Sequence, residues 1–151
     1  MSHQDDSRII DLAKASGAYG CVECGKCVAV CPMAEMYHNF SIEMSPRGVI
    51  KKAMMSPRVL EDESIWYCTE CNGGTDICPE GVSCRALIKG LRRLALADGF
   101  VKDPKKCALC GALYASVPVF EYLYDKLKGI PSKYLSICPS CRRIQYMGRN
   151  A

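Results

Sequence analysis

Four cysteines near the start of the chain have a spacing that could bind an iron–sulfur cluster. They form the run Cys21-x2-Cys24-x2-Cys27-x3-Cys31-Pro32. A cubane cluster needs one thiolate on each iron, and a cysteine at every third residue lets one tight loop supply three of them. In proteins with two clusters, the fourth cysteine of such a run binds the other cluster. The run therefore predicts a partner motif further along the chain.

The partner motif is present, but it lacks one cysteine. It reads Cys68-x2-Cys71-x6-Cys78-Pro79, and Gly74 stands where its third cysteine would be. If the last cysteine of each motif crosses to the other cluster, the first cluster receives four thiolates and the second receives three. The predicted ligands are Cys21, Cys24, Cys27 and Cys78 for the first cluster, a 4Fe–4S cubane, and Cys31, Cys68 and Cys71 for the second.

Three interpretations of the second cluster follow from Gly74. We favour a 3Fe–4S cluster, which needs no fourth thiolate. A site-differentiated 4Fe–4S cluster, whose open iron takes water, a small ligand or substrate, is the second interpretation. The third brings in Cys84 as the missing ligand. Cys84 follows Cys78 at the start of the next predicted helix, a position that favours a buried packing thiol.

Two further cysteine pairs lie near the end of the chain. They are Cys107-x2-Cys110-Gly111 and Cys138-x2-Cys141. Paired Cys-x2-Cys motifs are the ligand set of a four-thiolate zinc site, and a glycine after the second cysteine suits the tight turn of such a site. We expect structural zinc, which leaves no open position for catalysis, with a third iron site or a redox-active dithiol as alternatives.

Helical rather than alternating patterns of apolar residues separate the cysteine motifs, which predicts an all-α dicluster domain. Ser45 and Pro46 form a helix start, and Gly99 ends the last helix of this domain. We expect an iron–sulfur domain over residues 1–100, a linker at 102–106 and a small zinc-ribbon-like appendage within a metal-binding tail over 101–151. The predicted helices cover residues 7–16, a segment that begins at Ser45-Pro46, a segment that ends at 65–67, residues 87–98 and a segment around 120–127.

The composition favours metal binding over disulfides. The 151 residues include 12 cysteines, yet residues 1–20 have neither an apolar run nor a cleavage site typical of secretion. No apolar run approaches the roughly 18 residues of a membrane span. We therefore expect a cytoplasmic protein.

The charge is distributed unevenly along the chain. Residues 1–84 contain 12 acidic and 7 basic residues, whereas residues 85–151 contain 4 acidic and 13 basic residues. This difference predicts two surfaces with different partners, unless the basic face is simply solvated. We expect no nucleic-acid binding, because the arginines after Cys141 lack an accompanying aromatic platform. Glu23 and Glu70, each just before a cysteine, are expected to be exposed.

Several of these motifs together resemble the C subunit of heterodisulfide reductases, including relatives in sulfur-oxidising heterodisulfide-reductase-like complexes. The resemblance covers roughly residues 7–100 and rests on the first cysteine motif, Ser45-Pro46-Arg47-Gly48, residues 65–71 and residues 78–82. It implies an α-helical ferredoxin fold like that of the succinate dehydrogenase iron–sulfur subunit. It also implies an electron carrier between a flavin-containing subunit and a cysteine-rich catalytic subunit. Gly74 and the tail depart from the family pattern.

We therefore predict an iron–sulfur electron-transfer subunit of a heterodisulfide-reductase-like complex, with no catalytic residues of its own. One alternative is a zinc-stabilised interaction or nucleic-acid-binding module in which every cysteine site holds zinc. Another is a subunit whose open iron binds a sulfur substrate. The spacing of the first motif favours clusters over zinc.

Overall fold

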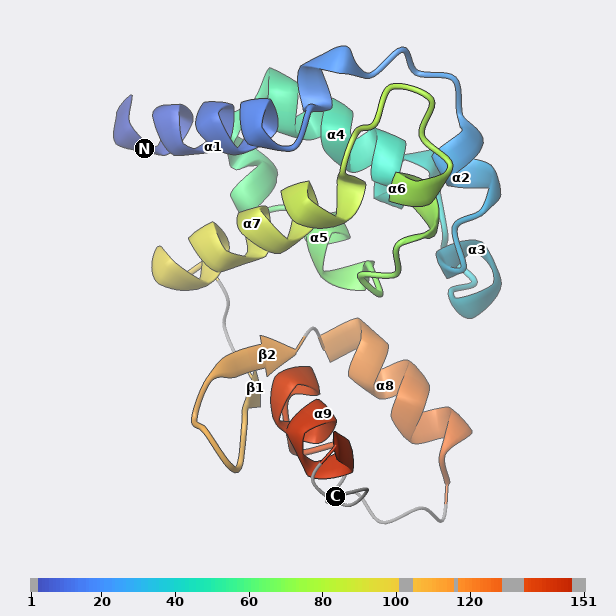
Figure 1. The fold of residues 1–151 in the computed structure, drawn as a ribbon, viewed down its shortest axis with the longest axis vertical. Coiled ribbons are helices and arrows are strands. Elements are labelled where there is room, and N and C mark those ends of the chain that lie inside the picture. Colours follow the sequence, from blue (N-terminus) through green and yellow to red (C-terminus); the bar gives the residue numbers. More distant parts are fainter. Residues whose placement is uncertain (1–2, 101–104, 116, 129–134, 148–151) are drawn as a thin grey trace. The chain divides into compact units, whose positions relative to one another are not determined.

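Short helices and cysteine-bearing loops make up the first of two units into which the chain divides, Met1–Phe100 and Val101–Ala151. The computed structural model describes residues 3–100, 105–115, 117–128 and 135–147. In Figure 1 the first unit runs from blue to yellow and the second from orange to red. The helices of the first unit are α1 (His3–Ala15), η1 (Ala18–Gly20), α2 (Lys26–Ala29), α3 (Met33–Met36), η2 (Ile42–Met44), α4 (Pro46–Met55), η3 (Pro57–Leu60), α5 (Ser64–Tyr67), α6 (Gly73–Asp76) and α7 (Cys84–Ala97).

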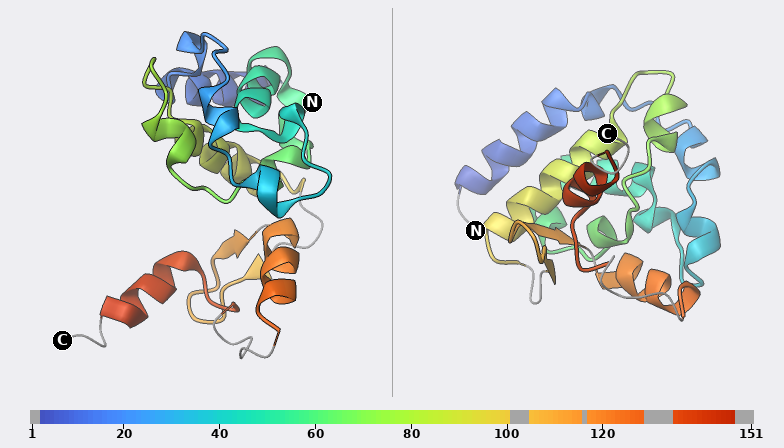
Figure 2. Two further views of the ribbon diagram at one scale, coloured as in Figure 1. Left: turned by 90° about the vertical axis from the view of Figure 1, so that its right-hand side faces the viewer. Right: turned by 60° about the horizontal axis from the view of Figure 1, so that its bottom comes forward.

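The three longest helices of this unit, α1, α4 and α7, pack against one another (Figure 1, Figure 2). Each turns apolar residues inward at a spacing of three or four, as expected for helices that bury one face. Helices α1 and α7 approach closely at Gly90, where an added Cβ would overlap the side chain of Leu12. The buried residues of these helices include Ile9, Ala13, Val49, Ile50, Leu87, Ile88 and Leu91.

Serine caps fix where the two helices next to the cysteine loops begin. The Ser45 hydroxyl accepts a hydrogen bond from the Gly48 amide at 3.2 Å, and Pro46 is the first residue of α4, which confirms the predicted helix start. The Ser83 hydroxyl accepts one from the Ala86 amide at 3.3 Å. Because of this cap, α7 begins at Cys84, slightly earlier than the apolar pattern predicts.

The second unit contains a two-stranded antiparallel sheet and two helices. Strands β1 (Lys105–Lys106) and β2 (Leu113–Ala115) pair with each other, and α8 (Val117–Lys126) and α9 (Pro139–Met147) follow. The predicted all-α fold is confirmed, with this short hairpin as its one pair of described strands. Residues 102–104 of the predicted linker lie outside the described residues. Within the described ranges, no helix combines the length and apolar character needed to cross a membrane.

Replacing Gly48 by alanine tests the close packing at the start of α4. An added Cβ would overlap the carbonyl groups of Ile42 and Glu43, which are backbone atoms and cannot rotate away. We expect G48A to lower stability by about 1–3 kcal/mol, seen as a lower melting temperature of the anaerobically purified protein. Gly20→Ala is the control, because a Cβ there meets nothing within 4 Å. Equal melting temperatures for the two variants would contradict this packing argument.

Candidate metal centres

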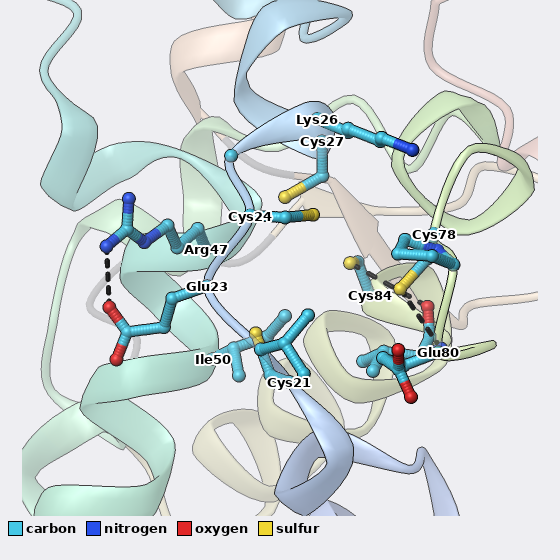
Figure 3. Close-up of a pocket in the computed structure, with 14 residues that line it drawn as sticks. Cys21, Glu23, Cys24, Lys26, Cys27, Arg47, Ile50, Cys78, Glu80 and Cys84 are labelled. Carbon is cyan, nitrogen blue, oxygen red and sulfur yellow. Dashed lines mark hydrogen bonds and ion pairs between the residues drawn. The ribbon is translucent and has the colours of Figure 1, made fainter.

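Four predicted ligands surround one pocket in the first unit, which we call the first site (Figure 3). Cys21 and Cys24 come from the loop that joins η1 to α2, Cys27 comes from α2 itself, and Cys78 comes from the loop before α7. Gly25 has a φ of 80°, a left-handed conformation that lets the loop turn between Cys24 and Cys27. The structure thus brings all four residues together, as a cubane with one thiolate per iron requires.

The other three predicted ligands line a separate pocket, which we call the second site. Cys68 and Cys71 come from the loop after α5, and Cys31 comes from the end of the first motif. Each motif therefore sends its last cysteine to the site of the other. The wall of the second site also includes Met33, Pro46, Gly74, Cys84 and Ile88.

The two sites share part of their walls. Cys27 and Cys84 line both pockets, so a single layer of side chains separates the first site from the second. Both residues are positioned by helices, Cys27 by α2 and Cys84 by the first turn of α7. Groups bound in the two sites would therefore be close neighbours.

The two cysteine loops share an unusual backbone conformation. Glu23 and Glu70 each precede the second cysteine of their motif, and they have φ values of 52° and 54°. Non-glycine residues rarely adopt this left-handed conformation, so both loops hold it at some cost. In the second loop the conformation directs the Glu70 amide at the Cys68 sulfur, 3.3 Å away. Such amide donors favour the charged thiolate.

Arg92 of α7 holds the second loop in place. Its guanidinium donates to the carbonyl oxygens of Ile65 at 2.7 Å and Cys68 at 2.5 Å, and it forms an ion pair with Glu70 at 2.7 Å. It also lies over the ring of Trp66, 5.6 Å from the centroid. The Arg92 side chain is only 12% exposed, so these contacts are largely shielded from water. One side chain thereby fixes the backbone on both sides of Cys68.

Arg47 of α4 makes the equivalent contact with the first loop. Its guanidinium donates to the Glu23 carboxylate at 2.5 Å, and Lys51 lies 3.5 Å from the same carboxylate. The hydrogen bond from Arg47 lowers the pKa of Glu23, and the charge of Lys51 adds to the effect. Each loop is thus tied to a following helix by an arginine–glutamate pair. This pair is more exposed than the Arg92 pair and contributes less to stability.

The role of these glutamates was not predicted from the sequence, where an exposed side chain is the default expectation for such loop positions. Glu23 is indeed 40% exposed and Glu70 31%, but both side chains are bound to arginine. The signal was the recurrence of Glu-Cys at the same place in both motifs. No local pattern identifies the arginines, since each lies 22 or more residues from its partner.

Burial favours the neutral form of two thiols at the second site. It raises the pKa of Cys31, and it raises the pKa of Cys68, where the positive charge of Arg92 opposes it. A thiolate becomes favourable there only beside a cation, so metal binding must displace the protons. The donor set and its surroundings therefore fit iron–sulfur clusters, which supply the missing positive charge.

Gly74 and Cys84 lie together at the second site. Gly74 is buried, and a Cβ added to it would lie 3.2 Å from the Cys27 Cβ and 3.8 Å from the Cys84 Sγ. Cys84 is 4% exposed, as predicted for a buried thiol. Burial and the neighbouring thiols of Cys27 and Cys78 raise its pKa to about 12. Its sulfur nevertheless faces two cysteine-lined pockets, which a purely packing thiol would not need to do.

The four tail cysteines form a third cluster of thiols, which we call the tail site. Cys107 and Cys110 lie in the hairpin between β1 and β2, and Cys138 and Cys141 flank the start of α9. All four sulfurs lie within 4.8 Å of one another. Gly111, with a φ of 70°, allows the tight turn after Cys110.

The tail site has the dimensions of a site for a single metal ion. Zinc–sulfur bonds of about 2.3 Å in a tetrahedron put the sulfurs about 3.8 Å apart. The sulfurs of Cys110 and Cys138 are 3.8 Å apart. The thiolates of a cubane bind four different irons and must lie further from one another. The geometry therefore fits one tetrahedral ion.

Backbone amides prepare one of the tail thiols for metal binding. Burial alone would raise the pKa of Cys107, but amides including that of Cys138, 3.2 Å from its sulfur, lower the pKa to about 6. Hydrogen bonds with Cys110 and Cys138 instead raise the pKa of Cys141 to about 12. The first thiolate therefore forms readily, and a bound cation would stabilise the others.

Comparison with known proteins agrees with this arrangement. Residues 17–82 match the family described as 4Fe-4S dicluster domain. This match includes all seven cysteines predicted from the two motifs as cluster ligands. This part of the chain is therefore similar to 4Fe–4S dicluster domains.

Curated relatives confirm the resemblance seen in the sequence. The chain is 36% identical over 91 residues to the C subunit of a ferredoxin:CoB-CoM heterodisulfide reductase of Methanosarcina acetivorans, covering 60% of this chain and 35% of that protein. It is 32% identical over 94 residues to a protein of Archaeoglobus profundus described as like the C subunit of heterodisulfide reductase, covering 59% and 48%. The corresponding C subunit of Methanosarcina mazei is 31% identical over 97 residues, covering 62% and 57%. The match thus spans about a third to a little over half of the relatives' length.

Replacing Arg92 tests its hold on the second loop. Arg92→Ala removes two donors to backbone carbonyls and an ion pair, and bonds from charged groups contribute about 1.5–3 kcal/mol each. We expect roughly half of the bound iron to be released to a chelator at least about tenfold faster than from the unchanged protein. Arg92→Lys should recover only part of the loss, because an ammonium cannot reproduce the forked contacts. The control is Arg93→Ala, an exposed neighbour on α7; release equal to that control would refute the role of Arg92.

Removing one tail thiol tests the independence of the tail site. In Cys110→Ala we expect zinc to fall from about one per chain to near zero, because three thiolates no longer complete the tetrahedron. Iron should remain at its full value, since the tail is a separate unit. Elemental analysis measures both metals. The control is Leu109→Ala, because Leu109 lies between Cys107 and Cys110 but its side chain is 58% exposed. Zinc retained in Cys110→Ala, or iron lost with it, would show that the sites are assigned wrongly.

Proposed function

We propose that the chain is the iron–sulfur electron-transfer subunit of a heterodisulfide-reductase-like complex. In this proposal it passes single electrons between a flavin-containing subunit and a cysteine-rich catalytic subunit. Clusters bound by Cys21, Cys24, Cys27 and Cys78 and by Cys31, Cys68 and Cys71 supply the one-electron chemistry. In this proposal the chain itself binds no substrate. We also propose that the complex is cytoplasmic, because unpaired cysteines persist in that compartment.

The shared wall between the two sites is the observation that supports this function best. Cys27 and Cys84 each line both pockets. Two clusters separated by one layer of side chains form a path along which an electron can move without a diffusing carrier. A protein that only needed metal for stability would not require two adjacent redox sites.

Each site also has an exposed edge at which an electron could enter or leave. Cys24 of the first site and Cys71 of the second are exposed, whereas the other ligands are at least half-buried. Val22, 59% exposed, lies beside the first edge, and Val30, 41% exposed, lies near Cys71. Exposed apolar side chains beside a buried cofactor favour docking of a partner. Two exposed edges, one at each site, fit a carrier that contacts a different partner at each site.

Positive side chains adjust the two sites toward accepting an electron. Lys26 and Arg47 line the first pocket, and Arg92 holds the second loop. A nearby positive charge stabilises the more negative, reduced form of a cluster and so raises its reduction potential. The buried position of Arg92 makes its charge effective at the second site.

The tail site is proposed to hold one structural zinc ion. The described residues of this unit bury few large apolar side chains, Phe120 and Leu135 among them, so a metal would contribute much of its stability. Four thiolates would leave that zinc no open position for chemistry. The basic charge of this part of the chain favours docking onto an acidic partner surface.

A redox titration of the isolated, anaerobically purified chain tests the proposed function. We expect it to take up about one electron per cluster from a low-potential reductant, and to return them to a one-electron acceptor. It should not reduce a disulfide without partner subunits, because the proposal assigns the catalytic site to a partner subunit. Disulfide reduction by the isolated chain, or no electron uptake at all, would contradict the carrier role.

A further inference from the structure

The second site has three motif cysteines where a cubane needs four, and we propose that Cys84 is the missing ligand. The second cluster would then be a complete 4Fe–4S cubane bound by four cysteines of this chain. This assignment replaces the 3Fe–4S cluster favoured from the sequence. It rests on the proposed function, since it takes both sites to hold iron–sulfur clusters. The proposed ligands are Cys31, Cys68, Cys71 and Cys84.

Position is the first argument. Cys84 is the first residue of α7 and lines the same pocket as Cys31, Cys68 and Cys71. Only 4% of it is exposed, so its thiol faces the protein interior and not water. The sulfur makes one long contact, 3.9 Å to the carbonyl oxygen of Val82. Little is lost if the sulfur turns to bind iron.

Gly74 supplies the second argument. A cysteine at this position would start from a Cβ that lies 3.8 Å from the Cys84 sulfur. The thiol of Cys84 therefore lies in van der Waals contact with the position from which the absent side chain would start. The same Cβ would also press on the Cβ of Cys27, at 3.2 Å. Gly74 and Cys84 thus complement each other, because the missing side chain of Gly74 leaves room for the thiol of Cys84.

The number of thiols decides between the two sites. Cys84 also lines the first pocket, where Figure 3 shows it with Cys21, Cys24, Cys27 and Cys78. That site already has one thiol for each iron of a cubane. The second site has one iron without a thiol. A fifth thiol is superfluous at the first site and completes the second.

Ligation by Cys84 is a simple exchange at sulfur. The S–H bond breaks, an Fe–S bond forms, and the proton leaves to solvent, with no change in oxidation state. Beside the cluster the thiol loses its proton, as thiols that coordinate metal do. A four-cysteine cluster would have no open iron, which leaves no place for a sulfur substrate at this site.

Iron analysis and electron paramagnetic resonance of variants of the full chain test the proposal. The unchanged protein should contain about eight irons and give no cluster signal when oxidised, because an oxidised 4Fe–4S cubane is diamagnetic. Cys84→Ala should contain about seven irons and show the signal of an oxidised 3Fe–4S cluster. Ser83→Ala weakens the start of the same helix without removing a thiol, and it should keep about eight irons.

A rescue variant assigns the effect to the second site. Gly74 lines the second pocket and is absent from the wall of the first. Adding Gly74→Cys to Cys84→Ala returns a cysteine to the motif and removes the sulfur that would crowd it. We expect this double variant to regain about eight irons and lose the 3Fe–4S signal. If Cys84→Ala alone does not accumulate, the double variant decides, and about seven irons in it would overturn the proposal.

The remaining outcomes separate this proposal from the function on which it rests. About eight irons in both the unchanged protein and Cys84→Ala would overturn the role of Cys84 and leave the carrier function standing. About seven irons with a 3Fe–4S signal in the unchanged protein would do the same. Negligible iron in anaerobically prepared unchanged protein would overturn the proposed function, and this proposal with it.

Discussion

The structure depends on gathering many thiols into a small volume without losing the fold. Five cysteine side chains line the first site and five line the second, with Cys27 and Cys84 in common. Thiolates that lie so close together repel one another, and burial raises the pKa of Cys31 and Cys84. Bound iron removes both problems, because it supplies the opposite charge and replaces the protons. The packed helices α1, α4 and α7 form the framework onto which the cysteine loops fold, and bound metal would hold the thiolates of these loops together.

A repeated loop design links this constraint to the rest of the first unit. Each cysteine loop has a glutamate in a left-handed conformation, and each glutamate is bound by an arginine from a later helix. The Arg92 pair is the more buried of the two and also binds the loop backbone. The second loop lacks a motif cysteine at Gly74, so it has more need of such support. The two cysteine loops thus share the same arginine–glutamate contact, but the second loop is held more firmly than the first.

Much of this architecture was predictable because cysteine spacing and helix caps are local signals. The crossed arrangement of Cys31 and Cys78 followed from motif logic, and Ser45 followed from its proline neighbour. The positioning role of Arg92 was not predictable, because it depends on contacts with residues more than 20 positions away. The ligand role proposed for Cys84 could not be singled out from the sequence for a similar reason. It has no motif around it, and only the fold shows that its sulfur lies 3.8 Å from where a Cβ at Gly74 would be.

Native mass spectrometry of the anaerobically purified chain tests the central claim most directly, because it weighs the bound inorganic atoms on each intact molecule. The account predicts one dominant species that carries two 4Fe–4S clusters and one further metal ion of the mass of zinc. That result would establish in a single spectrum that the chain binds two clusters of four irons each and one further metal ion. A dominant species with three separate metal ions and no inorganic sulfide would contradict the account.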